Sequence, residues 1–409
     1  MPALVRPPMP GEEAKAPPAL PAAPRPHGPE VQDALELFGD SYLASHAVTP
    51  QQERYVRDLR ACRTSALGVH RYECESCGDV TYSYDSCRNR HCPKCQGLAR
   101  EEWALRRSAE LLDVPHYHVV FTVPEELNPL FLRNQKAMYD LLFSCSWGTV
   151  REFAADRRHM GARAGAISVL HTWTQTLLYH PHVHMVVPAG GLTERGGWRH
   201  CGRSFFAPVK AMSQVFRARL VAGVRALARR GSLDLGGCAA HLAGDGLEAT
   251  LRQLFSKPWV VHCERPLGSA AHVVRYLARY THRAAIANSR VVSVGPEGVS
   301  FTWRDSREGR RTEKVMSLPG EEFVRRLLLH VLPPRYCRVR YFGILACRGK
   351  SGRLEECRRL TRTPRRPLPE GEAMRDLLVE RLIGRPRGTC ARCGGDVSED
   401  PSFLFHNLR

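Results

Sequence analysis

The pattern of apolar and polar positions predicts that folded structure begins near residue 30. Residues 1–29 are rich in Pro and Ala and offer few apolar side chains that can pack, so we expect a disordered tail there. Apolar residues recur at helical spacing over Val31–His46, and Leu98–Leu112 has the pattern of a charged amphipathic helix. Between these two predicted helices the sequence is rich in Cys and in turn-forming residues.

Three short segments in the middle of the chain predict β-strands because they are rich in β-branched and aromatic residues: Tyr117–Val123, Ala166–Trp173 and Pro181–Val187. Helical spacing of apolar residues lies around them, at Asn134–Phe153 and Met212–Arg230. The fold class is therefore predicted as α+β, with an antiparallel sheet and flanking helices.

The rest of the chain predicts a mixture of helices and strands. Ser269–His282 and Glu321–Val331 have helical patterns, while Arg290–Ser317 reads as strands that turn near residues 295–298 and Arg307–Arg310. Arg358–Pro367 is basic and interrupted by Pro, as expected of a linker.

Charge points to a polyanionic partner. The 409 residues carry a formal net charge of +19, mainly through Arg, whose planar guanidinium suits phosphate. An Arg-rich proteome could also account for this charge, and a basic surface can serve ribosomal or membrane contacts as well. No apolar run reaches the roughly 18 residues that span a membrane, and the first ten residues lack the apolar core of a secretory signal, so we expect a cytosolic protein without a membrane partner.

Four cysteines form two C-x2-C pairs separated by fourteen residues: Cys74, Cys77, Cys92 and Cys95. Four thiolates on two such turns can close a tetrahedral site, so we predict structural Zn²⁺ in a small zinc-binding domain. Such a closed site leaves no open position for chemistry, which makes the domain a scaffold for DNA binding or for docking.

Other possible ligands keep the zinc assignment open. Cys87 lies between the two pairs, with His70 and His91 beside them, so another ligand set or a second metal is possible, although a small buried residue is the commoner role for Cys87. Cys390 and Cys393 form a last C-x2-C pair with no second pair after it, and their role stays open.

The segment HPHVH, which begins at His180, predicts a second metal site. On a strand, alternate side chains share a face, so His182 and His184 point the same way while Val183 faces the core. That arrangement suits two ligands of one divalent ion. His171 and His180 lie in the same region, which strengthens the interpretation.

A helical pattern downstream places two phenols side by side. His272, Tyr276 and Tyr280 follow one another at four-residue spacing and therefore share one helical face. On an adjacent face the same spacing recurs in residues that could hold DNA phosphates: Arg275, Arg279 and Arg283. Helical tyrosines are more often core aromatics, so the spacing alone does not establish a nucleophile.

Five segments carry a resemblance to a known family: CRNRHCPKCQ from Cys87, HVVFTVPEEL from His118, HPHVH from His180, YLARYTHRAAIANSR from Tyr276 and RVRYFGILA from Arg338. In these segments the chain resembles the two-tyrosine HUH transposases of the IS91/ISCR insertion-sequence group, in the family's order over most of residues 60–350. It departs from the common HPHVHCLV form in having Met185, which should point to the core.

The resemblance implies an HUH endonuclease-like catalytic domain preceded by the zinc-binding domain. Residue by residue, it gives His182 and His184 the role of metal ligands and Tyr276 and Tyr280 that of nucleophiles. The third ligand stays open between His272, one turn before Tyr276, and His118 on a neighbouring strand.

The implied reaction is attack by a tyrosine oxygen on a phosphodiester of single-stranded or locally melted DNA, which leaves a 5′-phosphotyrosine. Mg²⁺ or Mn²⁺ would polarise the phosphate. Arg279 or Arg283 could favour the phenolate. Three alternatives are a plasmid replication initiator or relaxase, a zinc DNA-binding protein without activity, and a zinc hydrolase. The oligomeric state and the DNA sequences recognised do not follow from the sequence.

These patterns predict five ranges: a tail at 1–29, a helix with the zinc-binding domain at 30–112, the catalytic domain with the tyrosine helix at 113–317, a helical and basic part at 318–357, and a basic linker with the C-x2-C tail at 358–409.

Overall fold

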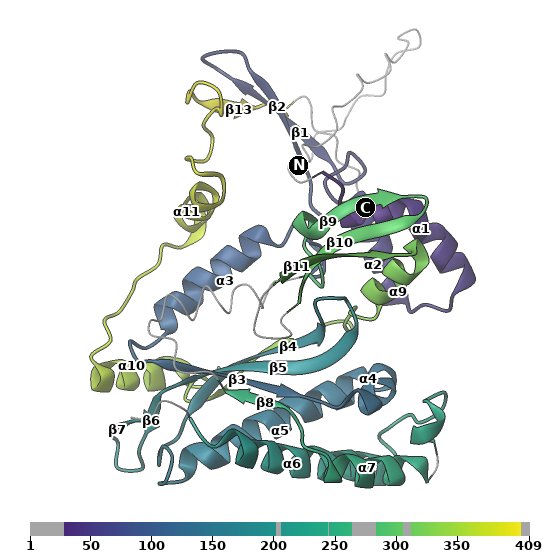
Figure 1. The fold of residues 1–409 in the computed structure, drawn as a ribbon. Helices are drawn as coiled ribbons and strands as arrows, with labels where there is room; N and C mark the ends of the chain where they lie inside the picture. The colour runs from purple at the N-terminus through teal and green to yellow at the C-terminus, as the bar shows by residue number, and fades with distance from the viewer. Residues whose placement is uncertain (1–27, 202–205, 244, 264–283, 306–311, 402–409) are drawn as a thin grey trace, which may run out of the picture. The chain divides into compact units, whose positions relative to one another are not determined.

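The computed structural model describes residues 28–201, 206–243, 245–263, 284–305 and 312–401, which form two compact units (Figure 1). Within the described residues, the smaller unit contains residues 61–86 and the segment from 388 onward, and the larger unit contains residues 28–60 and 87–387. The smaller unit therefore combines a segment from the first half of the chain with one from the second half. The predicted ranges 30–112 and 358–409 treat these two segments as separate parts.

The smaller unit is built on a three-stranded antiparallel sheet in the order β13-β1-β2. Its strands are β1 (Val69–Cys74), β2 (Val80–Tyr84) and β13 (Val397–Glu399). β1 and β2 form a hairpin, and β13 pairs with the other edge of β1 through Tyr72–Glu399 and Cys74–Val397.

The larger unit is organised around a five-stranded antiparallel sheet in the order β12-β4-β5-β3-β8. Its strands are β3 (His116–Thr122), β4 (Gly165–Trp173), β5 (Tyr179–Pro188), β8 (Val261–Cys263) and β12 (Val339–Gly343). The three strands predicted from β-branched and aromatic residues are its central strands, so the predicted antiparallel sheet is confirmed.

Helices cover one face of this sheet: α4 (Asn128–Arg133), α5 (Gln135–Ala155), α6 (Val209–Arg229) and α7 (Gly246–Ser256). Of these, α5, α6 and α7 run below the sheet in Figure 1. In α6, Met212, Phe216, Leu220 and Val224 recur every fourth residue and are buried, as expected of a helix with one apolar face. The main hydrophobic core lies between these helices and inward-facing strand residues such as Phe121.

On the opposite face of the sheet, apolar residues cover one end. There α3 (Gly97–Glu110) and α10 (Lys350–Thr361) contribute to a second core with Ile167, Val169 and Val186. Because alternate residues of a strand share a face, the next residues of β5 on this face are His184 and His182. Apolar packing thus gives way to histidines along the same strand.

The larger unit also contains a second sheet, further helices and a short hairpin. A three-stranded sheet contains β9 (Val291–Gly295), β10 (Gly298–Asp305) and β11 (Thr312–Leu318), and it packs with α1 (Val31–Ser45), α9 (Gly320–Leu328) and neighbouring α2 (Pro50–Ala61) (Figure 1). α11 (Gly371–Ile383) packs on α3, and the short strands β6 (Gly190–Leu192) and β7 (Trp198–His200) form a hairpin.

Most predicted elements are present with small changes at their ends, and one is wrong in part. Residues 358–361, predicted as the start of a linker, are the last turn of α10, because Leu354 and Cys357 bury one side of this helix. The predicted helix Ser269–His282, the turn at Arg307–Arg310 and residues 1–27 lie outside the described residues. In the part of the chain that the structure describes, none of the helices combines the length and apolar character of a membrane span.

Candidate functional site

Three histidines from two neighbouring strands lie together on one face of the large sheet: His171 of β4, with His182 and His184 of β5. The strand register pairs His171 directly with His182, while His184 follows two residues later on the same face. One ring nitrogen from each histidine lies within 4.8 Å of the others, so the three imidazoles can share a metal ion.

Desolvation keeps the imidazoles of His182 and His184 neutral, which is the form that binds a metal. Desolvation lowers the pKa of His182 to about 4 and holds the pKa of His184 well below its usual value. His182 Nδ1 lies 2.7 Å from the carbonyl oxygen of His180. If Nδ1–H donates to that carbonyl, the Nε2 lone pair of His182 is left for a ligand.

His118 lies beside this group rather than within it. Its Nε2 is 2.9 Å from Nδ1 of His184, and the two rings stack with centroids 5.2 Å apart. A hydrogen bond at Nδ1 fixes the orientation of His184 and directs its other nitrogen elsewhere. Of the two residues considered as a third ligand, His118 is thus next to His184, and His272 lies outside the described residues.

His171 is the member of the group that is not among the ligands predicted from the sequence. Its strand was predicted, and period-two alternation from Val169 places it on the histidine face of β4. The missing information was the pairing of β4 with β5, which puts His171 opposite His182.

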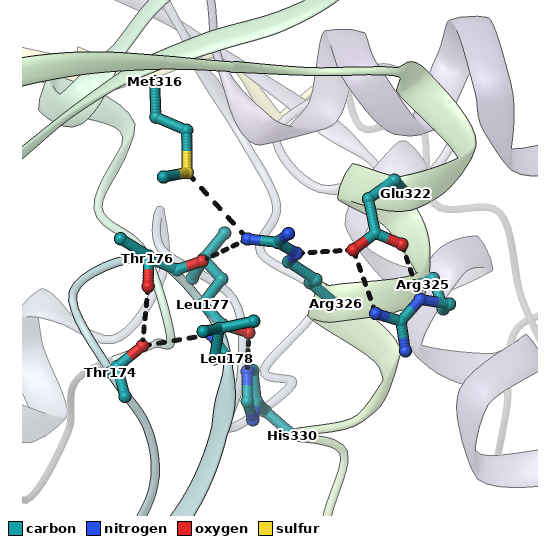
Figure 2. A network of polar contacts seen from close by, with 9 residues as sticks. All are labelled: Thr174, Thr176, Leu177, Leu178, Met316, Glu322, Arg325, Arg326 and His330. Atoms are coloured by element: carbon teal, nitrogen blue, oxygen red, sulfur yellow. Dashed lines mark hydrogen bonds and ion pairs between the residues drawn. The ribbon is translucent and has the colours of Figure 1, made fainter.

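The loop that joins β4 to β5 is held by side chains from the region of α9 (Figure 2). Arg326 Nη1 donates to the carbonyl of Thr176 at 2.8 Å, and His330 Nε2 lies 3.1 Å from the carbonyl of Leu177. Leu177 is fully buried and adopts φ +62°, an uncommon conformation for a residue other than Gly. These contacts fix the turn that sets the two histidine strands against each other.

Glu322 holds Arg326 in this position. Its carboxylate accepts hydrogen bonds from Arg326 Nε at 2.6 Å and from Arg325 Nε at 2.6 Å (Figure 2). The hydrogen bonds from Arg325 and then Arg326 lower the pKa of Glu322 to about 2. The carboxylate is therefore ionised, and it orients the guanidinium that reaches the loop.

The predicted nucleophile segment lies outside the described residues. This applies to the two tyrosines, to the basic residues beside them and to one candidate ligand: Tyr276, Tyr280, Arg275, Arg279, Arg283 and His272.

In the smaller unit, four cysteines from distant parts of the chain lie together: Cys74, Cys77, Cys390 and Cys393. Cys74 Sγ is 3.5 Å from Cys393 Sγ, and Cys77 Sγ is 3.8 Å from Cys390 Sγ. Hydrogen bonds from the backbone N–H groups of Cys393 and Arg392 lower the pKa of Cys390 to about 7. The pair whose role was open in the sequence is therefore part of a four-thiol group.

In the larger unit, Cys87, Cys92 and Cys95 lie together, with Cys87 Sγ 3.7 Å from Cys95 Sγ. Cys87 is thus part of a thiol group and not only a small buried residue.

The expected single set of Cys74, Cys77, Cys92 and Cys95 is corrected by these positions. Cys74 and Cys77 lie at the turn of the β1–β2 hairpin, and the chain leaves that turn along β2 before it reaches Cys87. β13, which follows Cys393, pairs with β1 instead and brings the last C-x2-C pair to Cys74.

The two histidines that flank the cysteine pairs have partners of their own. His70 Nδ1 lies 2.7 Å from a carboxylate oxygen of Glu399. His91 is buried, with its ring edge-on to Tyr55. Neither belongs to a thiol group in the described residues.

Comparison with known proteins gives consistent results across the chain. A family model described as "putative transposase" matches residues 165–352. A protein of Sinorhizobium fredii, also described as a putative transposase, is 40% identical over 371 residues, which cover 90% of this chain and 93% of that protein. A family model described as "transposase zinc-binding domain" matches residues 34–123. The transposase for insertion sequence element IS801 of Pseudomonas savastanoi pv. phaseolicola is 33% identical over 300 residues, 72% of this chain and 70% of that protein. No solved structure matches significantly.

Proposed function

Because this chain belongs to the IS91/ISCR family of transposases with a zinc-binding domain, we propose that it nicks and rejoins single-stranded or locally melted DNA during rolling-circle transposition of an insertion sequence. The convergence of three histidines on one sheet face, His171 and His184 buried and His182 half-buried, is the observation that carries the proposal. A transposase has DNA as its partner, and the net charge of +19 suits that partner. The HUH-type fold is part of the proposal.

The reaction uses a tyrosine oxygen as the nucleophile. The phenol of Tyr276 or Tyr280 loses its proton and attacks the scissile phosphorus, and the bond from phosphorus to the 3′ oxygen breaks. The 3′ oxygen takes up a proton, and the strand's 5′ phosphate stays on the tyrosine. The ester conserves the bond energy, so a 3′-hydroxyl can later attack it and rejoin DNA without ATP. A second tyrosine allows a second cut while the first strand is still held.

A phenol with an ordinary pKa near 10 is mostly protonated at neutral pH. Arg279 and Arg283, which are four residues apart, are the proposed source of positive charge that favours the phenolate. Arg275 completes the basic face proposed to hold DNA phosphates.

His182, His184 and His171 would hold a divalent ion, which polarises the scissile phosphate when bound. Their chemistry fits such an ion because desolvation keeps the pKa of His182 near 4, so that its imidazole is neutral. Three imidazole nitrogens suit Mn²⁺ better than Mg²⁺, which prefers oxygen ligands, so we expect higher activity with Mn²⁺. His118 orients His184 through the contact of its Nε2 with Nδ1 of His184.

The nucleophile is tested by covalent capture. Incubation with a labelled single strand that contains the end of the element should give a protein–DNA adduct that survives denaturation. Tyr276→Phe/Tyr280→Phe should lose the adduct and keep DNA binding, because only two hydroxyls are removed. Tyr82→Phe, a half-buried tyrosine of the smaller unit, is the matched control and should react normally. Adduct formation by the double variant would place the nucleophile elsewhere.

The metal ligands are tested by cleavage of the same strand. His182→Ala and His184→Ala should lose nearly all Mn²⁺-dependent cleavage, and His171→Ala should behave like them. His118→Ala should lose less, on the order of 10–100-fold, as is usual for a residue that orients a ligand. Full activity of His182→Ala or His184→Ala, or cleavage in excess EDTA, would reject the site.

A further inference from the structure

The four cysteines that meet in the smaller unit come from two turns of similar construction. In the first turn, Gly78 N–H donates to the carbonyl of Cys74, and in the second Gly394 N–H donates to the carbonyl of Cys390. Both glycines have positive φ, +67° and +78°, which residues with a side chain rarely adopt. Each glycine directly follows the second cysteine of its pair, so the two C-x2-C segments form equivalent turns.

The spacing of the sulfurs fits one metal ion rather than disulfides. Zn–S bonds of about 2.3 Å place the sulfurs of a regular tetrahedron about 3.8 Å apart. The observed Sγ–Sγ separations, 3.5 Å for Cys74 with Cys393 and 3.8 Å for Cys77 with Cys390, are close to that edge. A disulfide needs about 2.05 Å. All four thiols are free, and their sulfurs lie within 4.8 Å of one another.

The strands beside the cysteines hold the two turns together. β13 pairs with β1, and this pairing is reinforced by a hydrogen bond between His70 Nδ1 and the carboxylate of Glu399 at 2.7 Å and by an ion pair of Arg71 with Asp400 at 3.0 Å. A Cβ atom at Gly395 would lie 2.3 Å from Oγ of Ser76, so the second turn approaches the first too closely for a larger residue.

We propose that these four cysteines bind one Zn²⁺ and thereby fasten the C-terminal segment of the chain to its N-terminal hairpin: Cys74, Cys77, Cys390 and Cys393. We call them the terminal cysteine set. Cys74 and Cys393 are 319 residues apart, so the metal closes a loop that contains almost the whole described chain. Cys390 and Cys393 thus complete the metal site that Cys74 and Cys77 begin.

Zinc content of serine variants tests the membership of the set. Cys390→Ser/Cys393→Ser and Cys74→Ser/Cys77→Ser should each lose one zinc per chain relative to the unchanged protein. Combining all four substitutions should lose no more than one, because they remove the same ion. Cys337→Ser/Cys347→Ser, which changes two exposed cysteines outside the group, is the control and should keep all of its zinc.

Two outcomes of the zinc measurement would overturn the proposal. Unchanged zinc content in Cys390→Ser/Cys393→Ser would show that the last pair is not a ligand. A loss of two zinc ions on combining the two double substitutions would show that the pairs belong to different sites.

Alkylation of the unchanged, zinc-loaded protein provides a test that does not depend on how the variants fold. Cys77 and Cys393 are exposed, yet a bound metal should protect their sulfurs from a thiol reagent until a chelator is added. Cys337 and Cys347 are also exposed and should react at once in both conditions. Immediate reaction of Cys77 and Cys393 before chelation contradicts the proposal, and so does recovery of Cys74 and Cys393 as a disulfide.

Discussion

The contact of Arg326 with the β4–β5 loop gives a quantitative test of how the histidine strands are held. Arg326→Met keeps most of the apolar stem but removes the donors to Thr176 and Glu322. A hydrogen bond from a charged group contributes about 1.5–3 kcal/mol. The lost contact with Glu322 adds only about 0.5 kcal/mol, because Arg325 still pairs with that carboxylate.

The expected loss is therefore about 2–3.5 kcal/mol in the free energy of unfolding, which corresponds to a fall in Tm of roughly 3–5 °C for a unit of this size. Calorimetry of the purified protein measures it. Arg325→Met is the matched control: its side chain is 44% exposed and pairs with the same Glu322, so it should cost less than about 1 kcal/mol. If Arg325→Met destabilises as much as Arg326→Met, the bond to the loop carbonyl adds nothing and the reasoning is wrong.

Three other substitutions probe separate features of the larger unit. Gly343→Ala should strongly lower the free energy of unfolding in urea, because Gly343 has φ +60° and a Cβ there would lie 2.0 Å from the carbonyl oxygen of Ala164. A stability equal to that of the unchanged protein would contradict this packing. The pKa of Glu322 falls from 4.5 to about 2 in the folded state, so its stabilising contribution is complete above pH 4.5 and is lost as the pH falls toward 2. The stability difference between the unchanged protein and Glu322→Gln should therefore shrink over that interval, and a constant difference would refute the assignment. Tyr179→Phe breaks a buried hydroxyl pair with Tyr139 at 2.6 Å and should cost about 1–3 kcal/mol in chemical denaturation; no change would mean that the pair contributes nothing.

Local spacing predicted the central strands of the large sheet and the two histidines that share a face of one strand. Period-two alternation fixes which residues of a strand share a face, so His182 and His184 were predicted together before any pairing was known. The same reasoning predicted the central strands of an antiparallel sheet, which the structure confirms. The two-tyrosine helix follows from four-residue spacing and family resemblance, and it stays a prediction because it lies outside the described residues.

Contacts between distant segments could not be read from spacing. His171 becomes a neighbour of His182 only through the register of β4 with β5, which depends on how two strands pack in the whole sheet. The cysteines are a second case in which spacing along the chain does not predict which residues meet. The four cysteines of two nearby pairs have the spacing of one zinc site, but the β1–β2 hairpin carries the chain away after Cys77. The strand pairing of β13 with β1 then brings Cys393 to Cys74 across 319 residues. The sequence determined which side chains could bind metal, and the tertiary structure decided which of them meet, because ligand sets depend on distance in space and not on distance along the chain.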